Sequence, residues 1–273
     1  MKRLFLIFLL SLTIFLNIKG SVIQSDTLFL HRTGLTKTYF KSYLSDTKDF
    51  LLSPFKWERN DFYKATSFIG ASALLFAFDK KIYDFFQNNR SQGFDKMSKY
   101  LFEPIGSGLY ASIGFGALYL HGVFYDNDNN RQFGLLAAKT FLISGLMAQL
   151  SKSVFGRHRP YYDMPPNPEK FSPISLKNSS YISGHTTIAF SMATIIAMEF
   201  KDRPLIPVIS YTLATFAGIS RIYDNKHWAT DVLGGAVIGY TVGRFLYKKN
   251  RNIKVIPSMG PSYTGISMFV SIN

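Results

Sequence analysis

Residues 220–231 read SRIYDNKHWATD and stand directly before the last long apolar segment of the chain, 232–247. His227 and Asp231 are four positions apart, so a helix that begins here would place both side chains on one face. A carboxylate that bonds to one ring nitrogen of a histidine fixes its tautomer and leaves the other nitrogen available as a nucleophile. Arg221 can fold back towards the same place. A surface His–Asp pair on a capped helix would give the same pattern, so this stretch alone leaves both interpretations open.

A second polar group lies further upstream, where residues 181–187 read YISGHTT at the start of the apolar segment 186–199. A Ser-Gly-His turn before a helix presents backbone N–H groups and the positive end of the helix dipole, which together suit an anion. His185 in this position could protonate a leaving oxygen. An ordinary serine N-cap beside an incidental histidine would look the same.

A third group, residues 152–160, reads KSVFGRHRP and follows the apolar segment 134–150. Arginine offers a planar fork that matches phosphate oxygens, and lysine supplies a mobile point charge. The helix dipole and membrane topology also favour cations at such a position, so alone this group favours an ordinary basic helix end.

The three groups together are far more specific than any one of them. Their order and spacing are Lys-x6-Arg-Pro, then Ser-Gly-His, then Ser-Arg-x5-His-x3-Asp. In this arrangement the sequence resembles the phosphatidic acid phosphatase type 2 / vanadium haloperoxidase superfamily, over about 134–247 and, counting all apolar segments, over roughly 66–247. The family usually has proline where this chain has Ile182, a departure that removes no reacting group. The matching residues are Lys152, Arg159, Pro160, Ser183, Gly184, His185, Ser220, Arg221, His227 and Asp231.

The resemblance implies a role for each matching side chain. His227 would be the nucleophile that forms a phosphohistidine, and Asp231 would orient its ring. His185 would protonate the leaving alkoxide and later activate water. Cationic groups for the spreading charge, with a nucleophile in line opposite an acid, are also what phosphoryl transfer needs on chemical grounds. The phosphate oxygens would be held by Lys152, Arg159, Ser183, Gly184 and Arg221.

Two neighbouring residues, Arg157 and His158, are expected near the mouth of the pocket in a satisfied surface role. The sequence contains no visible metal-ligand cluster, so we expect metal-independent chemistry and no cofactor. The absence of cysteine excludes disulfide scaffolds, Fe–S clusters and thiol nucleophiles.

The remaining pattern predicts an all-α fold, a bundle of about six core helices that could span a membrane. The apolar segments lack the alternation of half-buried strands, and at 13–19 residues they lie between core helices and membrane spans in length. Their number favours a polytopic protein, whereas Lys139 and His121 inside them favour a bundle that faces water. Small residues such as Gly106, Gly108, Gly114 and Gly116 would allow close helix approach. The segments lie near 66–78, 106–124, 134–150, 186–199, 205–219 and 232–247.

The ends of the chain are different in character. Residues 1–20 combine a basic start with an apolar run of 13 residues, 4–16, which predicts a secretory signal, although an N-terminal anchor or a short buried helix also fits. Residues 21–65 are a mixed polar extension, expected to form short helices or loops on the main body. The catalytic helical domain would cover 66–250. The tail, 251–273, is β-prone and predicts a small hairpin.

The chain of 273 residues carries a formal net charge of +14, which indicates an anionic partner. No nucleic-acid module appears, and the basic residues do not form one stripe, so nucleic acid is not expected. A phosphorylated lipid or small phosphomonoester and an anionic membrane surface remain. The mean hydropathy of +0.06 is high for a soluble enzyme and low for a chain mostly immersed in lipid.

Together with the resemblance, these observations predict a phosphatase of the cell envelope that hydrolyses phosphomonoesters or pyrophosphates, and the resemblance implies that it does so through a phosphohistidine. Phosphatidic acid, prenyl pyrophosphate and lipid A phosphates are the expected substrates, with the active site facing the periplasm. A cleaved signal followed by six spans would instead place the site in the cytoplasm. The alternatives are a soluble periplasmic acid phosphatase of broad specificity, a vanadium haloperoxidase, because vanadate mimics phosphate, and a non-enzymatic membrane-surface binder.

Overall fold

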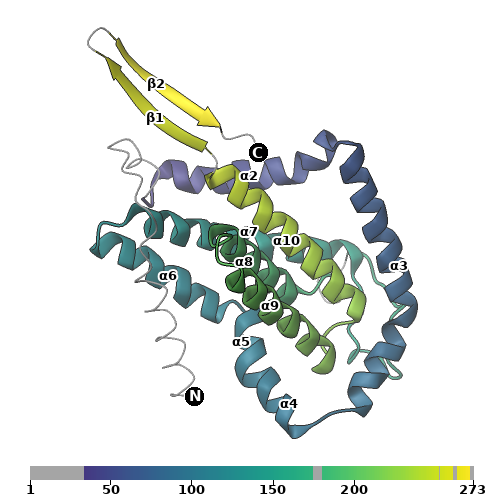
Figure 1. Cartoon of the computed structure of the whole chain (residues 1–273). Helices are drawn as coiled ribbons and strands as arrows, with labels where there is room; N and C mark the ends of the chain where they lie inside the picture. Colours follow the sequence, from purple (N-terminus) through teal and green to yellow (C-terminus); the bar gives the residue numbers. More distant parts are fainter. Residues whose placement is uncertain (1–33, 175–179, 252, 261–262, 271–273) are drawn as a thin grey trace.

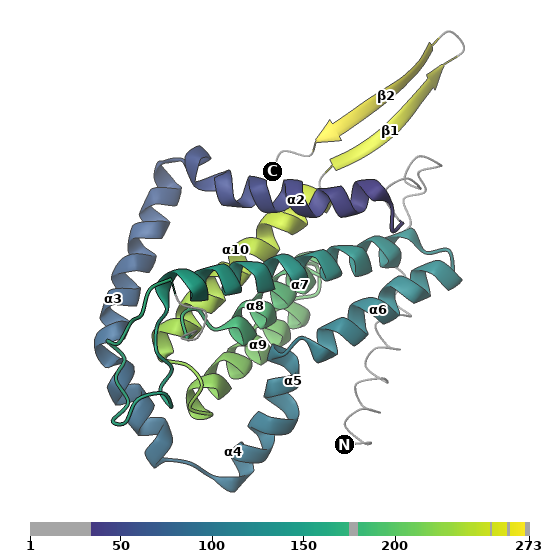
Figure 2. The same cartoon turned by 180° about the vertical axis from the view of Figure 1, so that it is seen from behind.

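The computed structural model describes residues 34–174, 180–251, 253–260 and 263–270. Its centre is a helical bundle, which confirms the predicted all-α class (Figures 1 and 2). The predicted apolar segments lie in helices, except that 107–108 form a turn. The bundle helices are α6 (Leu109–Phe124), α7 (Asp128–Phe155), α8 (Gly184–Glu199), α9 (Leu205–Tyr223) and α10 (Ala229–Arg251).

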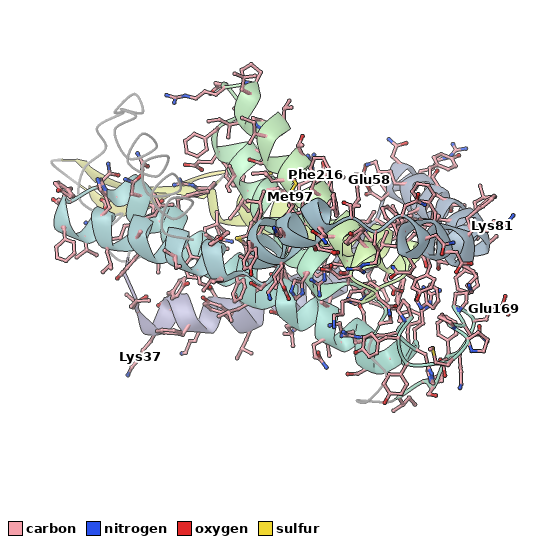
Figure 3. All side chains as sticks on the ribbon, turned by 90° about the horizontal axis from the view of Figure 1, so that it is seen from below. Lys37, Glu58, Lys81, Met97, Glu169 and Phe216 are labelled. Atoms are coloured by element: carbon pink, nitrogen blue, oxygen red, sulfur yellow. The ribbon has the colours of Figure 1, made fainter. Side chains whose placement is uncertain are left out.

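The chain before α6 frames this bundle, with α2 across the top of the bundle and α3 along one side of it (Figure 1). Residues 37–65 therefore form longer helices than expected, and the boundary predicted at residue 65 lies inside the continuous helix α3. Lys37 at the start of α2 and Lys81 on α3 project away from the bundle (Figure 3). The elements are α2 (Lys37–Leu52), the 3-10 turn η2 (Ser53–Lys56), α3 (Arg59–Asn88), α4 (Gln92–Met97), the π-helical turn η3 (Ser98–Phe102) and α5 (Glu103–Gly106).

Three glycines on α10 bring this helix close to α8. Gly235, Gly239 and Gly243 are spaced four apart, so they share one face of α10. A Cβ atom at these positions would lie 2.7, 2.4 and 2.7 Å, respectively, from backbone carbonyl oxygens of α8 or of its N-cap. Real Cβ atoms do not approach so closely, so only glycine permits this packing. The contact holds the N-terminal ends of α8 and α10 side by side.

The glycines singled out from the sequence behave differently from one another. Gly106 lies against His185, where a Cβ atom would meet the histidine Cβ at 2.9 Å, and Gly108 adopts a left-handed φ of +81° before α6. Within the described part of the chain, nothing lies within 4 Å of a Cβ atom on Gly114 or Gly116. The prediction of close helix approach was wrong for these two, because that face of α6 is open.

The core is formed mainly by α7, α8 and α10. Lys139 is buried within α7, where its Nζ donates to Asp46 Oδ2 of α2 at 2.8 Å and to Asn250 Oδ1 of α10 at 3.0 Å. Lys139 therefore does not favour a bundle that faces water, because a carboxylate from α2 neutralises it. The main core cluster comprises Phe133, Leu136, Ala137, Ile143, Met147, Met192, Ile195, Val242 and Leu246.

The tail forms the predicted hairpin, in which β1 (Ile253–Gly260) pairs antiparallel with β2 (Tyr263–Val270), Ile253 opposite Val270. The predicted signal, 1–20, lies outside the described residues. Among the described helices, α7 and α9 are long and apolar enough to cross a membrane, and α6 is apolar but shorter.

Candidate active site

The three sequence motifs meet at one end of the bundle. Lys152 lies in the last turn of α7, and Arg221 lies in the last turn of α9. Ser183 is the N-cap of α8, so Gly184 and His185 form its first turn. A Cβ atom on Gly184 would stand 3.3 Å from Lys152 Nζ, so glycine lets the ammonium group approach the start of α8.

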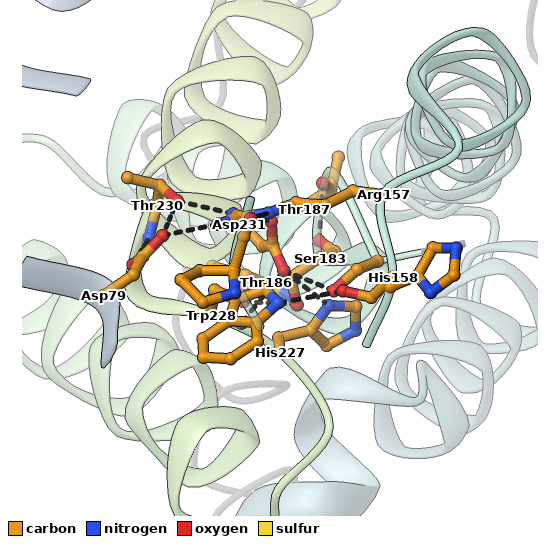
Figure 4. A network of polar contacts seen from close by, with 12 residues as sticks. Asp79, Arg157, His158, Ser183, Thr186, Thr187, His227, Trp228, Thr230 and Asp231 are labelled. Carbon is orange, nitrogen blue, oxygen red and sulfur yellow. Dashed lines mark hydrogen bonds and ion pairs between the residues drawn. The ribbon is translucent and has the colours of Figure 1, made fainter. Parts of the chain in front are cut away.

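His227 and Asp231 form a buried pair at the start of α10. His227 Nδ1 lies 3.5 Å from Asp231 Oδ2, and their side chains are 3% and 0% exposed (Figure 4). The carboxylate therefore faces one ring nitrogen, which leaves Nε2 as the candidate nucleophile. Oδ2 also accepts hydrogen bonds from Ser180 Oγ at 2.5 Å and from the Trp228 N–H at 2.9 Å.

The two histidines of the site are both held in the neutral form. Burial lowers the pKa of His227 to about 4, although Asp231 opposes the shift. A neutral imidazole is the form that a nucleophile requires. Burial, together with the positive charges of Arg221, Lys152 and Arg159, lowers the pKa of His185 to about 3. A phosphate dianion among these cations would oppose their effect and raise the pKa of His185, as a general acid needs.

Arg221 has buried donor atoms without a hydrogen-bond acceptor in the described part of the chain. Its Nε and Nη1 atoms are buried and make no hydrogen bond with any described residue. The acidic groups near Nη1 are Asp224 Oδ2 at 3.5 Å and Glu103 Oε1 at 3.8 Å. Buried donors without a hydrogen-bond partner are costly, so their presence beside His185 and His227 favours a bound anion as acceptor.

Ser183 ties the start of α8 to α10. Its Oγ accepts a hydrogen bond from Thr186 Oγ1 at 2.9 Å, and its N–H donates to the Asp231 carbonyl at 2.9 Å. The N–H groups of Gly184 and His185 follow in the first turn, where a helix offers no acceptor of its own. These two amides are therefore the candidate donors to an anion. The preceding peptide bond, between Tyr181 and Ile182, is cis.

Arg157 does not have the expected surface role. Its side chain is 1% exposed and lies between two carboxylates, because Nη1 donates to Asp231 Oδ1 and Nη2 donates to Asp79 Oδ2, both at 2.7 Å (Figure 4). Burial would raise the pKa of Asp231, but Arg157, the His227 ring and the hydrogen bond from Ser180 hold it below its usual value. The prediction was wrong because the partner from α3, far upstream in the sequence, was not foreseen.

His158 is also buried and lies in the loop that follows α7. Its Nδ1 lies 2.9 Å from Asp163 Oδ2 and its Nε2 lies 3.1 Å from Ser172 Oγ. Its carbonyl accepts a hydrogen bond from Trp228 Nε1 at 2.9 Å. These contacts fix the loop to the turn that carries His227, so the surface interpretation was wrong here too.

Sequence reasoning missed Asp79, Ser180 and Trp228. Asp79 follows directly after the apolar segment 66–78, and a carboxylate at that edge was the one available signal. Among the described residues, no group of three or more His, Cys, Asp or Glu side chains could hold a metal ion.

Comparison with known proteins agrees with this geometry. The family model of the PAP2 superfamily matches residues 133–254, which contain all three motifs. The segment that carries the three motifs therefore has the sequence signature of the PAP2 superfamily. Among solved structures, a transmembrane PAP2-type phosphatidylglycerolphosphate phosphatase from Bacillus subtilis superposes with a TM-score of 0.55 at 22% identity, covering 70% of this chain and 98% of that one. It shares the fold.

Curated relatives include the lipid A 1-phosphatase of Porphyromonas gingivalis, 42% identical over 106 residues, which cover 38% of this chain and 21% of that protein. The undecaprenyl-diphosphatase BcrC of Bacillus subtilis is 27% identical over 145 residues, 51% of this chain and 69% of that protein. The chain spans between 21% and 61% of the length of the first four curated relatives it matches.

Proposed function

We propose that this protein removes phosphate from phosphorylated lipids at a cell-envelope membrane, without a metal ion, through a phosphohistidine on His227. The observation that carries the proposal is the buried pair of His227 and Asp231 beside Lys152, Arg159 and Arg221, where Arg221 holds unused buried donors. The relatives act on lipid A and undecaprenyl diphosphate, which supports the same substrate class.

Binding comes first in the proposed mechanism. The phosphate accepts hydrogen bonds from Arg221, from Lys152 and Arg159, and from the first-turn amides of α8. These donors face the oxygens on which negative charge is shared in the transition state.

Chemistry follows in two steps. The Nε2 lone pair of His227 attacks phosphorus, the bond from phosphorus to the lipid oxygen breaks, and His185 gives that oxygen its proton. Asp231 stabilises the positive charge that develops on the ring of His227. Water then attacks the phosphohistidine while His185 takes a proton from it, which releases inorganic phosphate and restores His227.

A lipid substrate is supported by the surface of the protein as well as by its relatives. α2 turns Tyr39, Tyr43 and Asp46 towards the bundle, where Tyr39 donates to the Leu135 carbonyl. Its outer face carries an apolar stripe beside a row of lysines, a pattern typical of helices that lie in a membrane interface with anionic lipid heads. The stripe is formed by Phe40, Leu44 and Leu51, which are 57%, 79% and 50% exposed, and the exposed lysines are Lys37, Lys41 and Lys48.

The test is an activity panel on the full chain in detergent, with EDTA present. We expect phosphate release from at least one of phosphatidic acid, phosphatidylglycerol phosphate, undecaprenyl diphosphate and lipid A, with inhibition by vanadate. A soluble phosphomonoester should be a poorer substrate. Equal turnover of soluble esters would indicate the broad-specificity phosphatase, and halide oxidation by peroxide with vanadate would indicate the haloperoxidase. Loss of activity in EDTA would reject the mechanism.

The site is proposed to face the periplasm. Because the chain contains no cysteine, a single cysteine at Met164, which is 90% exposed in the loop between α7 and α8, gives a clean label. An impermeant maleimide should label Met164→Cys in cells whose outer membrane is permeabilised. Labelling only after the inner membrane is broken would place the site in the cytoplasm.

A further inference from the structure

A buried triad of charges joins three parts of the chain behind the catalytic pair. Arg157 lies between Asp79 of α3 and Asp231 of α10, with both hydrogen bonds at 2.7 Å. All three side chains are at most 1% exposed. Buried ions without partners are strongly destabilising, so the three groups depend on one another.

The network fixes the position of each member. Asp79 Oδ1 accepts a hydrogen bond from the backbone N–H of Thr230 at 2.9 Å, and Asp79 Oδ2 accepts one from Thr230 Oγ1 at 2.5 Å. Asp79 of α3 therefore caps the first turn of α10. Arg157 Nε donates to the Pro168 carbonyl at 3.0 Å, and Nη1 also donates to Thr230 Oγ1 at 2.7 Å. Aromatic rings surround the guanidinium group, with centroids at 4.9, 5.5 and 5.5 Å; they belong to Phe76, Phe171 and Trp228.

This arrangement has a geometric consequence for the catalytic pair. Arg157 occupies Asp231 Oδ1, so the carboxylate can turn only Oδ2 towards His227. Oδ2 is also held by Ser180 and by the Trp228 N–H, which leaves the carboxylate no freedom to rotate. The orientation of the His227 ring therefore depends on residues that do not touch it.

It also has an electrostatic consequence. Asp79 offsets part of the charge of Arg157, so Arg157 neutralises less of the negative charge that Asp231 presents to His227. If Asp79 were neutral, Arg157 would offset Asp231 and the imidazolium would be less stable. If Arg157 were neutral, the surplus negative charge would make the imidazolium more stable.

We propose that Asp79 and Arg157 are positioning residues of the reaction, which aim Asp231 Oδ2 at His227 and set the charge that Asp231 presents to its ring. The proposal rests on the proposed function of this site. It extends the catalytic machinery to α3, outside the matched segment 133–254.

The test is the titration of His227 in protein labelled with ¹⁵N-histidine, read by NMR without substrate. The signal of His227 is identified among those of the five histidines because it disappears in His227→Gln. Asp79→Asn should lower the pKa of His227, and Arg157→Gln should raise it. The other charged or titratable groups that act on His227 are unchanged in both variants; they are Asp231, Arg159, Lys152 and His185. The matched control is Asp84→Asn, which breaks an exposed ion pair with Lys80 on the same helix and should leave the titration unchanged.

Kinetics provide the second readout. Arg157→Lys keeps the charge but cannot reach Asp231, Thr230 and Asp79 together, so the pKa of His227 should stay near that of the wild type. Its kcat should fall between about 10- and 100-fold, the range for residues that orient metal-binding histidines in the same way, with KM little changed. This milder variant also serves if Asp79→Asn or Arg157→Gln fails to fold.

Shifts of the His227 pKa in the same direction, or no shift, in Asp79→Asn and Arg157→Gln would overturn the proposal. So would an Arg157→Lys protein whose kcat equals that of the wild type. The titration needs no substrate, so its result is independent of the activity. If the two variants show opposite shifts but the wild-type protein hydrolyses no lipid phosphate, the proposed function is rejected and the effect of the charge triad on His227 still stands.

Discussion

Gly239 of α10 lies directly against the backbone carbonyl of Thr187 in α8, where a Cβ atom would stand 2.4 Å from the oxygen. Gly235 and Gly243 repeat this contact one turn before and one turn after. The close approach of the two backbones explains how His185, at the start of α8, and His227, just before α10, come to share one site.

The first prediction concerns this helix contact. Gly239→Ala should lower the free energy of unfolding by about 1–3 kcal/mol, since the methyl group must push α10 away from α8. The same shift should reduce phosphate release. Chemical unfolding and the activity assay measure the two effects. The matched control is Gly116→Ala on the open face of α6, which should stabilise the helix by about 0.5–1 kcal/mol and leave activity intact. Equal effects of the two substitutions would contradict the packing argument.

The second prediction separates stability from binding at Arg221. Arg221→Met removes buried donors that make no hydrogen bond with any described residue, so the unliganded protein should melt at the same or a higher temperature. The rise in melting temperature that vanadate produces should disappear, because the anion loses its buried partner. Arg244→Met, on the exposed surface of α10, should keep the full rise. A variant that melts earlier yet still responds to vanadate would show that Arg221 is structural.

The third prediction concerns the proton on His185. Its pKa is about 3 before an anion binds, and a bound anion raises it, so binding should take up a proton and strengthen as the pH falls. Calorimetry of vanadate binding in two buffers with different ionisation enthalpies measures this uptake. His185→Gln should take up fewer protons on binding than the wild type. Any protonation of vanadate itself contributes equally in the two proteins. Identical uptake in the two proteins would exclude His185 as the group that gains the proton.

The fourth prediction tests the buried pair of Lys139 and Asp46, far from the motifs along α7. Asp46→Leu leaves the ammonium group of Lys139 buried without its carboxylate, which should cost about 3–5 kcal/mol of the free energy of unfolding. The double variant Asp46→Leu, Lys139→Met should recover most of that loss. Denaturant unfolding of four proteins, the wild type, Asp46→Leu, Lys139→Met and the double variant, gives the coupling energy. Additive losses would show that the pair is not the reason for the burial of Lys139.

The helices and the membership of the site could be predicted from the sequence because both depend on local patterns. Lys152, His185, Arg221 and His227 stand at the edges of apolar segments, and the ends of packed helices meet where the bundle ends. The hairpin also follows from local β-propensity and the turn residues near Gly260.

The partners of buried charges could not be predicted in the same way. Asp79 is 78 positions from Arg157, and Asp46 is 93 positions from Lys139. A basic residue beside a motif looks the same in sequence whether a distant carboxylate neutralises it or water surrounds it. The carboxylate partners come from α2 and α3, and no sequence motif specifies how these helices pack.

The central claim is tested most directly by trapping the phosphorylated enzyme. A lipid phosphate labelled with ³²P is mixed with the wild type and with His227→Asn in EDTA, quenched in alkali within the first turnovers, and the label is located by peptide mapping. The account predicts label on His227 that is stable to alkali and released by acid, and none on the variant. Phosphate release by the wild type with no labelled histidine, or equal labelling of His227→Asn, would contradict it.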